Sequence, residues 1–239
     1  MEFQNLHNKV AYITGGTKGI GLGIAKVLLD AGMRVAISGR IPENIREAVE
    51  NLGDKSSVIG VQSDVRNFVD EQAAVERILD HFGQLDVVVA NAGLGNFKPV
   101  DEMTLDEWNQ MIDTNLTGAF HTLKATVEEL KKSEGYYITI SSLAGTNFFE
   151  TASGYNASKF GLVGFTQAAM LDLRKYGIKV STIMPGSVAT YFNNHTPDEK
   201  DSWKIQPEDI GQLVLDLLKM SPRTLPSKIE VRPTRPDLK

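Results

Sequence analysis

Tyr155 and Lys159, a tyrosine and a lysine four residues apart, could carry out proton transfer. Residues at positions i and i+4 of one helix lie on the same face, a turn apart. A cation in that place stabilises a phenolate and lowers the pKa of the phenol from its reference value of about 10. The tyrosine could then act as a general acid or base near neutral pH. Ser142, thirteen residues before Tyr155, could hold a substrate oxygen against the phenol. The same spacing also fits an ordinary helix start with an exposed lysine.

A glycine-rich segment near the N-terminus follows an apolar, β-branched run at residues 9–14. An apolar helical pattern comes next and ends near Gly32. Strand, glycine turn and helix in this order begin a dinucleotide-binding βαβ unit. Glycines let the backbone approach a pyrophosphate, and the helix N-terminus supplies free N–H groups and positive dipole. The spacing is G-x-x-x-G-x-G, unlike the general G-x-G-x-x-G fingerprint.

The end of the next expected strand, residues 34–38, indicates which nicotinamide cofactor binds. An acidic residue about 20 positions after the glycines usually takes the ribose 2′-hydroxyl of NAD. Here Gly39 stands between Ser38 and Arg40, so no carboxylate would repel a 2′-phosphate. Arg40 and Lys18 could both reach such a phosphate, the arginine with a planar fork, although both could also be solvated surface charges. We therefore predict NADP(H) over NAD(H).

Strands and helices alternate along the whole chain. Further strands are expected at residues 57–61, 85–90, 136–140, 178–184 and 228–232, and helices at 42–52, 68–82, 104–132, 154–175 and 207–220. This alternation predicts an α/β fold with one doubly wound parallel sheet of about seven strands and helices on both faces. In such folds ligands bind outside the carboxyl ends of the strands. The residues expected at those ends are Gly15, Gly39, Asp64, Asn91, Ser142 and Pro185.

Two polar residues along this expected edge have open alternatives. Asp64 could line the adenine region of a cofactor or cap a turn, and both can hold. Asn115 lies within the expected helix at 104–132, which Thr104 and Glu107 open with a capping-box pattern. Amides are poor helix formers, so Asn115 has a special role, such as a kink with an ordered water, or simply faces solvent.

The bulk composition narrows the class of protein. The chain has 239 residues, of which 41% are hydrophobic, and fits one α/β domain over residues 1–239. A net charge of −5 disfavours nucleic acid as a partner. With no cysteine, no membrane-spanning apolar run and no metal-ligand cluster, we expect a cytoplasmic protein without a metal. The polar stretch 191–205 is expected to be a substrate-side loop, and 233–239 a tail.

The order and spacing of these motifs resemble the short-chain dehydrogenase/reductase family over nearly the whole chain. The resemblance rests on Thr14-Gly15-x-x-x-Gly19-x-Gly21, Asn91-Ala92-Gly93, Asn115, Ser142, Tyr155-x-x-x-Lys159 and Pro185-Gly186. It implies that Tyr155 donates a proton to a carbonyl oxygen and that Lys159 holds the nicotinamide ribose and lowers the tyrosine pKa. It also implies that Ser142, the later residue of a Ser-Ser pair, binds the substrate oxygen, and that Asn115 positions a water.

The expected cofactor contacts extend around the whole strand edge. They are Gly15, Thr17, Lys18, Gly19, Ile20, Gly21, Ser38, Gly39, Arg40, Asp64, Val65, Asn91, Ala92, Gly93, Tyr155, Lys159, Pro185, Gly186, Val188 and Thr190. From their positions in loops, the residues expected to line the substrate pocket are Leu94, Phe97, Phe148, Phe149, Tyr191 and Phe192. His195 is expected at the surface rather than against the substrate.

The resemblance is closest to the 3-oxoacyl-carrier-protein reductases and carbonyl reductases, and implies NADPH-dependent reduction of a ketone or aldehyde. An NAD-linked alcohol or sugar dehydrogenase is the alternative, and a non-catalytic NADP-sensing protein is a different class that usually loses the tyrosine or lysine. The C-terminal segment 225–233 departs from the Gly-rich pattern of those reductases, which disfavours an acyl-carrier-protein substrate. In this family the two long helices commonly pair between subunits, so a homodimer or homotetramer is expected.

Overall fold

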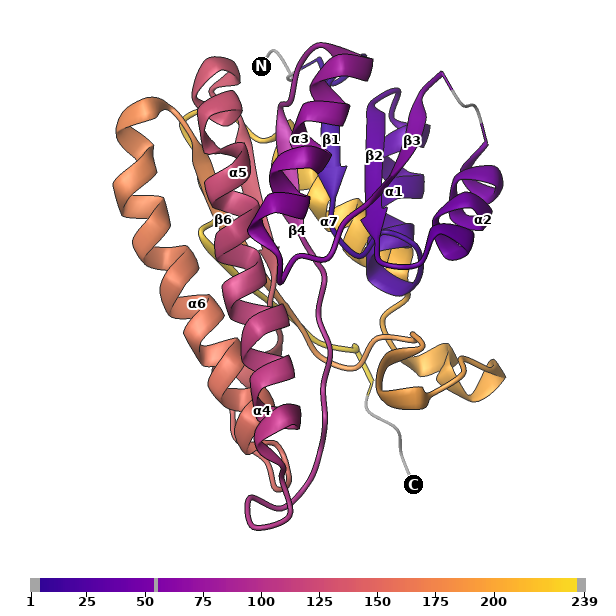
Figure 1. Ribbon diagram of the computed structural model, residues 1–239, viewed down its shortest axis with the longest axis vertical. Coiled ribbons are helices and arrows are strands. Elements are labelled where there is room, and N and C mark those ends of the chain that lie inside the picture. Colours follow the sequence, from indigo (N-terminus) through magenta and orange to yellow (C-terminus); the bar gives the residue numbers. More distant parts are fainter. Residues whose placement is uncertain (1–4, 54–55, 236–239) are drawn as a thin grey trace.

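The computed structural model describes residues 5–53 and 56–235 and confirms the predicted α/β fold. One parallel sheet of seven strands has the order β3-β2-β1-β4-β5-β6-β7, with helices on both faces (Figure 1). The strands are β1 (Val10–Ile13), β2 (Arg34–Gly39), β3 (Val58–Gln62), β4 (Val87–Ala90), β5 (Tyr136–Ile140), β6 (Lys179–Pro185) and β7 (Lys228–Val231). The α-helices are α1 (Gly19–Asp30), α2 (Pro42–Leu52), α3 (Phe68–Phe82), α4 (Leu105–Ile112), α5 (Gly118–Ser133), α6 (Ser153–Leu173) and α7 (Pro207–Lys219).

The centre of the sheet is β1, which pairs with β2 on one side and β4 on the other. Ile13, the last residue of β1, is in register with Ile37 of β2 and Val89 of β4. All residues of β1 and β4 are buried, as expected for parallel strands covered on both faces. The strand order reverses between β1 and β4, which is where α/β sheets of this kind open a ligand crevice at their carboxyl edge.

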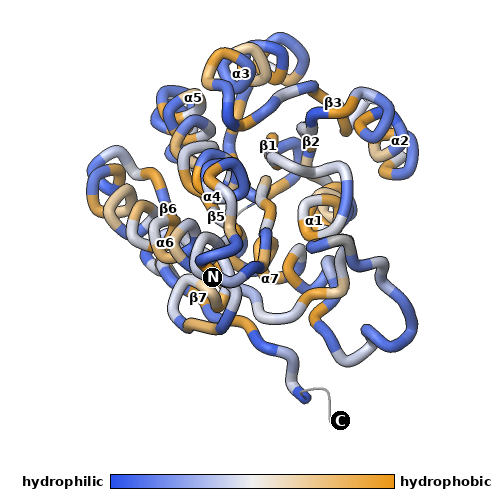
Figure 2. The backbone as a smooth tube through the Cα atoms, turned by 60° about the horizontal axis from the view of Figure 1, so that its bottom comes forward, coloured by the Kyte–Doolittle hydropathy of each residue, from blue (hydrophilic) through white to orange (hydrophobic). Residues whose placement is uncertain are grey.

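Two hydrophobic layers enclose the sheet. On one face Ile24 and Leu28 of α1 pack with Ile210 and Val214 of α7 against the strands. On the other face α3, α5 and α6 cover the sheet with a second cluster that includes Ile78, Leu123 and Leu162. Figure 2 shows helices that alternate hydrophobic and hydrophilic residues around the more hydrophobic strands. The amphipathic periodicity read in the sequence therefore produces the burial that holds the helices on the sheet.

The long helix expected at residues 104–132 is present as one continuous helical run with a π-helical turn inside it. Thr104 caps α4 with the predicted capping box, in which Glu107 is the partner. A π-helical turn, Asp113–Thr117, then separates α4 from α5. Asn115 lies in this turn and is 1% exposed, so it does not face solvent. Turns of this kind occur often at functional sites, because they shift side chains out of the α-helical register.

The polar stretch 191–205 is folded into two short 3₁₀ turns, Phe192–Asn194 and Glu199–Trp203. Its base is closed by backbone hydrogen bonds, since the N–H of Ile205 donates to the carbonyl of Ser187 at 3.1 Å and the N–H of Ala189 donates to that of Ile205 at 2.9 Å. The carboxylate of Asp201 pairs with Lys204 and His195 inside the stretch. His195 is therefore held by a carboxylate of its own segment.

Two expectations concern the chain outside these elements. The expected tail, 233–239, is only partly covered, because residues 236–239 lie outside the described residues. Across the described residues, every helix is too short or too polar to cross a bilayer.

Candidate active site

The glycine turn after β1 is fixed to the end of β4 by Asn91. The side-chain amide of Asn91 donates to the carbonyls of Thr14 and Gly15, at 2.9 and 3.1 Å. In return, the backbone N–H groups of Asn91 and Ala92 both donate to the hydroxyl of Thr14 at 3.1 Å. Gly15 has a φ of 63°, and a Cβ there would lie 2.9 Å from the Cα of Ala92. Only glycine therefore permits this close approach of the two turns.

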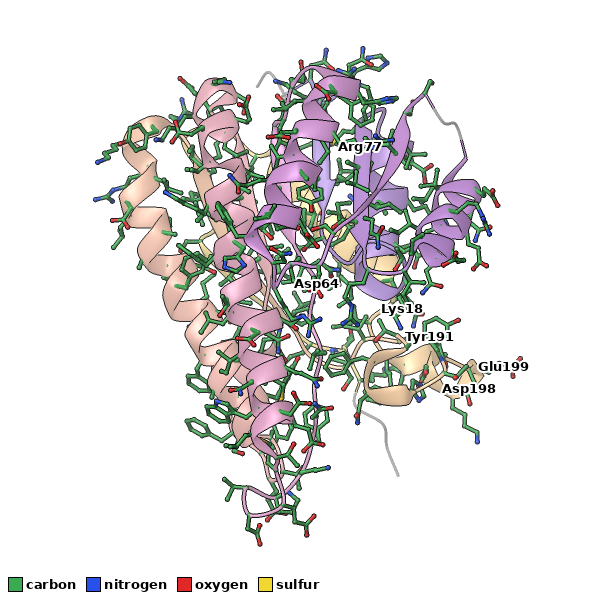
Figure 3. The ribbon with its side chains drawn as sticks, viewed as in Figure 1. Lys18, Asp64, Arg77, Tyr191, Asp198 and Glu199 are labelled. Carbon is green, nitrogen blue, oxygen red and sulfur yellow. The ribbon has the colours of Figure 1, made fainter. Side chains whose placement is uncertain are left out.

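The N-terminus of α1 is open to an anion. Its N-cap residue, Lys18, makes no side-chain capping bond, and the first turn holds no acidic residue. The first N–H groups of a helix have no partner within it, so they favour a phosphate. A Cβ on Gly19 would come within 3.3 Å of Thr190, which brings the segment after β6 to the same place. Figure 3 shows Lys18 at this edge of the molecule, on the side that carries Tyr191.

The segment after β6 completes this edge. Gly186 follows Pro185, the last residue of β6, and donates its N–H to the carbonyl of Val231 at 2.8 Å. A Cβ on Gly186 would lie 3.1 Å from Leu143, in the turn that follows β5. Val188 forms an isolated parallel bridge with Ile205. The expected contacts from Pro185 to Thr190 therefore lie between the turn after β5 and the start of α1.

The carboxyl ends of the strands form one edge of the sheet, here called the rim. At the ends of β2 and β3, not every expected cofactor residue faces this rim. Arg40 is exposed there, as is Lys18. Ser38 is buried and its hydroxyl is hydrogen-bonded to the phenolic oxygen of Tyr12 at 3.1 Å, so its side chain faces the interior of the protein. The carboxylate of Asp64 accepts two hydrogen bonds from the Nε of Arg66, both of 3.0 Å. This bonding lowers the pKa of Asp64.

Val65 follows Asp64 and is buried. A Cβ on Gly118, at the start of α5, would lie 2.6 Å from a methyl group of Val65. Its side chain therefore packs against α5, and only its backbone is left to meet a ligand at the rim.

Tyr155 and Lys159 lie on the buried face of α6, as their spacing predicts. Burial raises the pKa of Tyr155 to about 12, and a hydrogen bond with Ser142 opposes that rise. Burial also lowers the pKa of Lys159 to about 8. The lysine Nζ lies 5.7 Å from the centre of the tyrosine ring and donates to the carbonyl of Ile140 at 3.0 Å. The ammonium is therefore held beside the tyrosine by a backbone carbonyl.

The two serines after β5 have different surroundings. Ser141 is buried, and its hydroxyl donates to the carbonyl of Lys159 at 3.3 Å. The hydroxyl of Ser142 accepts a hydrogen bond from the N–H of Ala144 at 3.1 Å and also interacts with Tyr155. Ser142 is therefore the serine beside the phenol, and Ser141 fastens the strand end to α6.

Asn115 connects three segments around the tyrosine. Its amide nitrogen donates to the carbonyl of Leu94 at 2.8 Å and to the hydroxyl of Ser158 at 2.9 Å. Its amide oxygen accepts from the N–H of Leu94 at 2.8 Å. The hydroxyl of Ser158 donates in turn to the carbonyl of Tyr155 at 2.8 Å. Sequence reasoning missed Ser158, although a small polar residue beside Lys159 was the available signal.

Gly93 leaves room between Asn115 and Lys159. A Cβ at this glycine would lie 3.3 Å from the amide oxygen of Asn115 and 3.5 Å from the Nζ of Lys159. Gly15, Gly19 and Gly93 therefore leave the backbone accessible along one rim, which runs from the start of α1 to Lys159. Such a rim fits an extended dinucleotide, with a phosphate group at the helix N-terminus.

Aromatic side chains cover the outer side of Tyr155. The ring centres of Phe97 and Phe192 lie 5.3 and 5.6 Å from that of Tyr155. Phe149 contacts Phe97 at 5.8 Å, and Leu94 packs in the same cluster. Leu94, Phe97, Phe149 and Phe192, all expected in the pocket lining, therefore pack together on this side of the tyrosine.

Phe148 and Tyr191 were expected in that lining, and the structure places them elsewhere. Phe148 is 82% exposed and stacks on Phe160 with ring centres 5.2 Å apart. Tyr191 lines a different hollow of about 330 Å³ beside α1 and α7. Their neighbours in sequence lie in the cluster, where Phe192 contacts Tyr155 and Phe149 contacts Phe97, because adjacent loop residues point in different directions.

This arrangement can protonate a carbonyl oxygen. A phenol is protonated near neutral pH already at its ordinary pKa of about 10, and the neighbouring Ser142 hydroxyl can hold the same oxygen. Two hydroxyl groups beside that oxygen would stabilise the negative charge that develops on it during reduction.

Comparison with known proteins agrees with this geometry. The family model for short chain dehydrogenases matches residues 9–201. An uncharacterised oxidoreductase of Staphylococcus epidermidis is 30% identical over 94% of this chain and 97% of its own. Another from Staphylococcus aureus is 33% identical over 95% of this chain and 98% of its own.

Two solved structures share the fold. An alcohol dehydrogenase from the archaeon Thermococcus sibiricus, complexed with 5-hydroxy-NADP, has a TM-score of 0.90 and 29% identity, covering 97% of this chain and 100% of the other. A 3-ketoacyl-(acyl-carrier-protein) reductase from Brucella melitensis, complexed with NADH, has a TM-score of 0.88 and 24% identity, covering 96% and 99%. The chain belongs to the short-chain dehydrogenase family, and is an oxidoreductase that acts on CH–OH and C=O groups.

Proposed function

We propose that this protein reduces a ketone or an aldehyde to an alcohol with NADPH. The observation that carries the proposal is the contact between the hydroxyls of Tyr155 and Ser142, with Lys159 one turn along the same helix. A protonated phenol is the form needed to complete a reduction. Oxidation of an alcohol needs the phenolate, so an NAD-linked dehydrogenase working in the oxidative direction is the second candidate.

In this proposal each residue of the site has a defined role. Ser142 and Tyr155 bind the carbonyl oxygen, and Tyr155 gives it a proton as negative charge builds up. Asn115 positions Tyr155 through Ser158 and the Leu94 backbone, and is also the residue we assign to holding a water. The nicotinamide cofactor, when bound, supplies the hydride.

The same rim provides the residues to hold that cofactor. We assign the pyrophosphate to the backbone of the glycine turn and the N-terminus of α1, and the nicotinamide ribose to Lys159. The 2′-phosphate of NADP is assigned to Arg40 and Lys18, both exposed cations. A dehydrogenase of similar structure carries an NADP derivative, and a more distant reductase carries NADH.

A screen tests the activity. Purified protein is mixed with NADPH and a panel of ketones and aldehydes, and the loss of NADPH absorbance is followed. We expect turnover of at least one carbonyl. Binding of NADPH without consumption across the whole panel would favour a cofactor-sensing protein instead.

The cofactor assignment has its own test in Arg40→Ala. Loss of a charge-assisted contact of this kind costs about tenfold in affinity, so the KM for NADPH should rise by about that factor while the KM for NADH stays unchanged. Arg46→Ala, at an exposed arginine of α2, is the matched control and should leave both values unchanged. Tighter binding of NADH than NADPH by the unaltered protein would show that the assignment is wrong.

We also propose that copies of the chain pair through the outer faces of α5 and α6. Large apolar side chains are exposed there, including Phe120, Phe160 and Leu171. A hollow of about 550 Å³ beside α6 is lined by Val100, Phe148 and Phe149 among others. Exposed apolar patches of this kind mark interaction surfaces. Light scattering at micromolar concentration should give a dimer or tetramer, and a monomer would contradict this pairing.

A further inference from the structure

Three aromatic rings from separate segments meet at the candidate proton donor. Phe97 comes from the loop after β4, Tyr155 from α6 and Phe192 from the segment after β6. Both phenylalanines contact the tyrosine, and their own ring centres are 6.1 Å apart. The planes of each pair are inclined by 53° to 68°, which brings ring edges against ring faces. A group bound at the hydroxyl of Tyr155 therefore has aromatic surface beside it.

Gly95 is what lets Phe192 reach this position. A Cβ on Gly95 would lie 2.6 Å from the Cζ of Phe192 and 3.2 Å from that of Phe97. The first distance is too short for two real side-chain carbons and the second is tight, so any other residue here would displace the ring of Phe192. Phe192 is seated over the backbone of the loop after β4, and its own segment is closed at the base by the Ser187–Ile205 hydrogen bond.

Several charged groups of these two segments are paired with an opposite charge or lie away from the rings. Lys98 pairs with Glu107 at 2.6 Å, and Lys204 pairs with Asp201 at 2.6 Å. Asp201 also holds His195. Figure 3 shows Asp198 and Glu199 at the outer end of their segment, farther from the body of the protein than Tyr191. A charged substituent against the rings would be desolvated without a partner, which is costly.

We propose that the site takes a neutral carbonyl compound with an aromatic ring on the carbonyl carbon, such as an aryl alkyl ketone or an aromatic aldehyde. This inference rests on the proposed reductase function. The carbonyl oxygen is fixed by Tyr155 and Ser142, so a substituent on the same carbon lies within reach of Phe97 and Phe192. A flat ring makes edge-to-face and offset contacts with them that a saturated ring of equal size cannot make. The reduction adds a hydride to the carbonyl carbon and the Tyr155 proton to its oxygen.

A matched pair of ketones tests this contact. Acetophenone and cyclohexyl methyl ketone have the same carbon skeleton and differ in whether the ring is aromatic. Phe97→Leu and Phe192→Leu should each lower kcat/KM for acetophenone about five- to tenfold, mainly through KM, and change the cyclohexyl ketone less than about twofold. Phe148→Leu is the control, because its ring stacks on Phe160 outside this cluster, and it should change neither. Equal losses for both ketones in the Phe97 and Phe192 variants would overturn the inference.

Binding without turnover separates this inference from the proposed function. With NADP⁺ present no reduction can occur, so the affinity for each ketone can be measured by calorimetry. Acetophenone should bind more tightly than the cyclohexyl ketone, and 4-methylacetophenone at least about tenfold more tightly than 4-acetylbenzoate. Aryl binding with no NADPH consumption would refute the reductase and leave the aromatic site standing. Reduction of aliphatic carbonyls with no preference for the aryl ketone would refute the aromatic site and leave the reductase standing.

Discussion

Tyr12 and Tyr155 are both buried tyrosines in polar clusters, and each has one ionisable neighbour. Tyr155 lies beside the cation Lys159, with the Ser142 hydroxyl in contact. Tyr12, in β1, donates its phenolic hydrogen to a carboxylate oxygen of Glu71 at 2.9 Å. Burial is the main cause that raises the pKa of both phenols, and the charge of Glu71 raises that of Tyr12 further.

The two clusters differ in the charge of the ionisable group beside the tyrosine. A carboxylate accepts the phenolic hydrogen, so the proton of Tyr12 is committed to a hydrogen bond inside the protein. An ammonium accepts nothing, so the proton of Tyr155 is available to a bound substrate. A buried tyrosine with an ionisable partner is therefore no sign of catalysis until the partner's role as donor or acceptor is known.

The two clusters also differ in what they join. Glu71, on α3, accepts a second hydrogen bond from the Ser63 hydroxyl at 2.6 Å. Its other oxygen has no hydrogen-bond partner among the described residues, and burial raises the pKa of this carboxyl. Through Tyr12 the cluster also holds Ser38, so it ties together the ends of β2 and β3 beneath the rim. We infer that this cluster stabilises the fold and that the Tyr155 cluster performs the chemistry.

The largest effect that separates the clusters is expected from Tyr155→Phe. Removal of a general acid costs about 10²- to 10⁴-fold in rate, so carbonyl reduction should fall by about that factor. Cofactor affinity, measured by fluorescence titration, should change less than about threefold. Tyr12→Phe, the matched change in the other cluster, should leave kcat within about threefold. Comparable losses of activity in the two variants would contradict the assignment of the chemistry to the Tyr155 cluster and of stability to the Tyr12 cluster.

Lys159 should leave a signature in how stability depends on pH. Its pKa is about 8 in the folded protein, below the ordinary 10.5, so between these values the unfolded chain binds the proton and the folded protein does not. The free energy of unfolding should therefore rise with pH from about 8 to 10.5, by up to about 3 kcal/mol. Urea unfolding at a series of pH values measures this rise, which Lys159→Met should abolish. If the free energy of unfolding of Lys159→Met rose with pH as in the unaltered protein, another group would be the cause of the rise.

The sequence predicted the fold because alternating apolar runs and glycine turns leave few topologies. The helix Phe68–Phe82 appears with the predicted bounds, and the parallel order follows from the alternation. The π turn at Asn115 was not predicted, because the spacing of hydrophobic residues does not show which carbonyl oxygen accepts the hydrogen bond from each backbone N–H. Glu71 was also overlooked. Its burial depends on α3 meeting β1 and β3, which no local pattern encodes.

Within the candidate site, residue identity was easier to predict than environment. The spacing of Tyr155 and Lys159 gave their shared helix face, because that is a property of one helix. The burial of Tyr155 and Lys159 could not be predicted, since it depends on how much protein surrounds the two side chains. Phe148 and Tyr191 were placed wrongly for a similar reason, because the direction of a loop side chain is set by contacts distant in sequence.

An effect on stability is also expected at Glu71. Glu71→Leu would leave the buried hydroxyls of Tyr12 and Ser63 without their acceptor, at a cost of about 1–3 kcal/mol for each. Glu71→Gln keeps an acceptor oxygen and should cost less.

The same carboxyl should also make stability depend on pH. Because the folded pKa of this carboxyl is raised, its contribution to stability is complete below the unfolded pKa of about 4.5. That contribution is lost as pH rises through the folded pKa, and Glu71→Gln should remove the loss. Urea unfolding of both variants across this pH range measures which variant is less stable and how the free energy of unfolding changes with pH. A Leu variant as stable as the Gln variant would contradict the role of Glu71 as an acceptor.

The smallest effect is expected from Tyr12→Phe on stability, about 1 kcal/mol for one buried hydrogen bond. Tyr137→Phe is the matched control, since that buried phenol donates to the backbone carbonyl of Ala119 at 2.6 Å. Both variants should lose similar stability at one pH. Only Tyr12→Phe removes a hydrogen bond that lowers the pKa of Glu71, so only in that variant should the pH-dependent loss of stability extend to higher pH. Identical pH profiles in the two variants would show that Tyr12 acts on the fold without acting through the carboxyl.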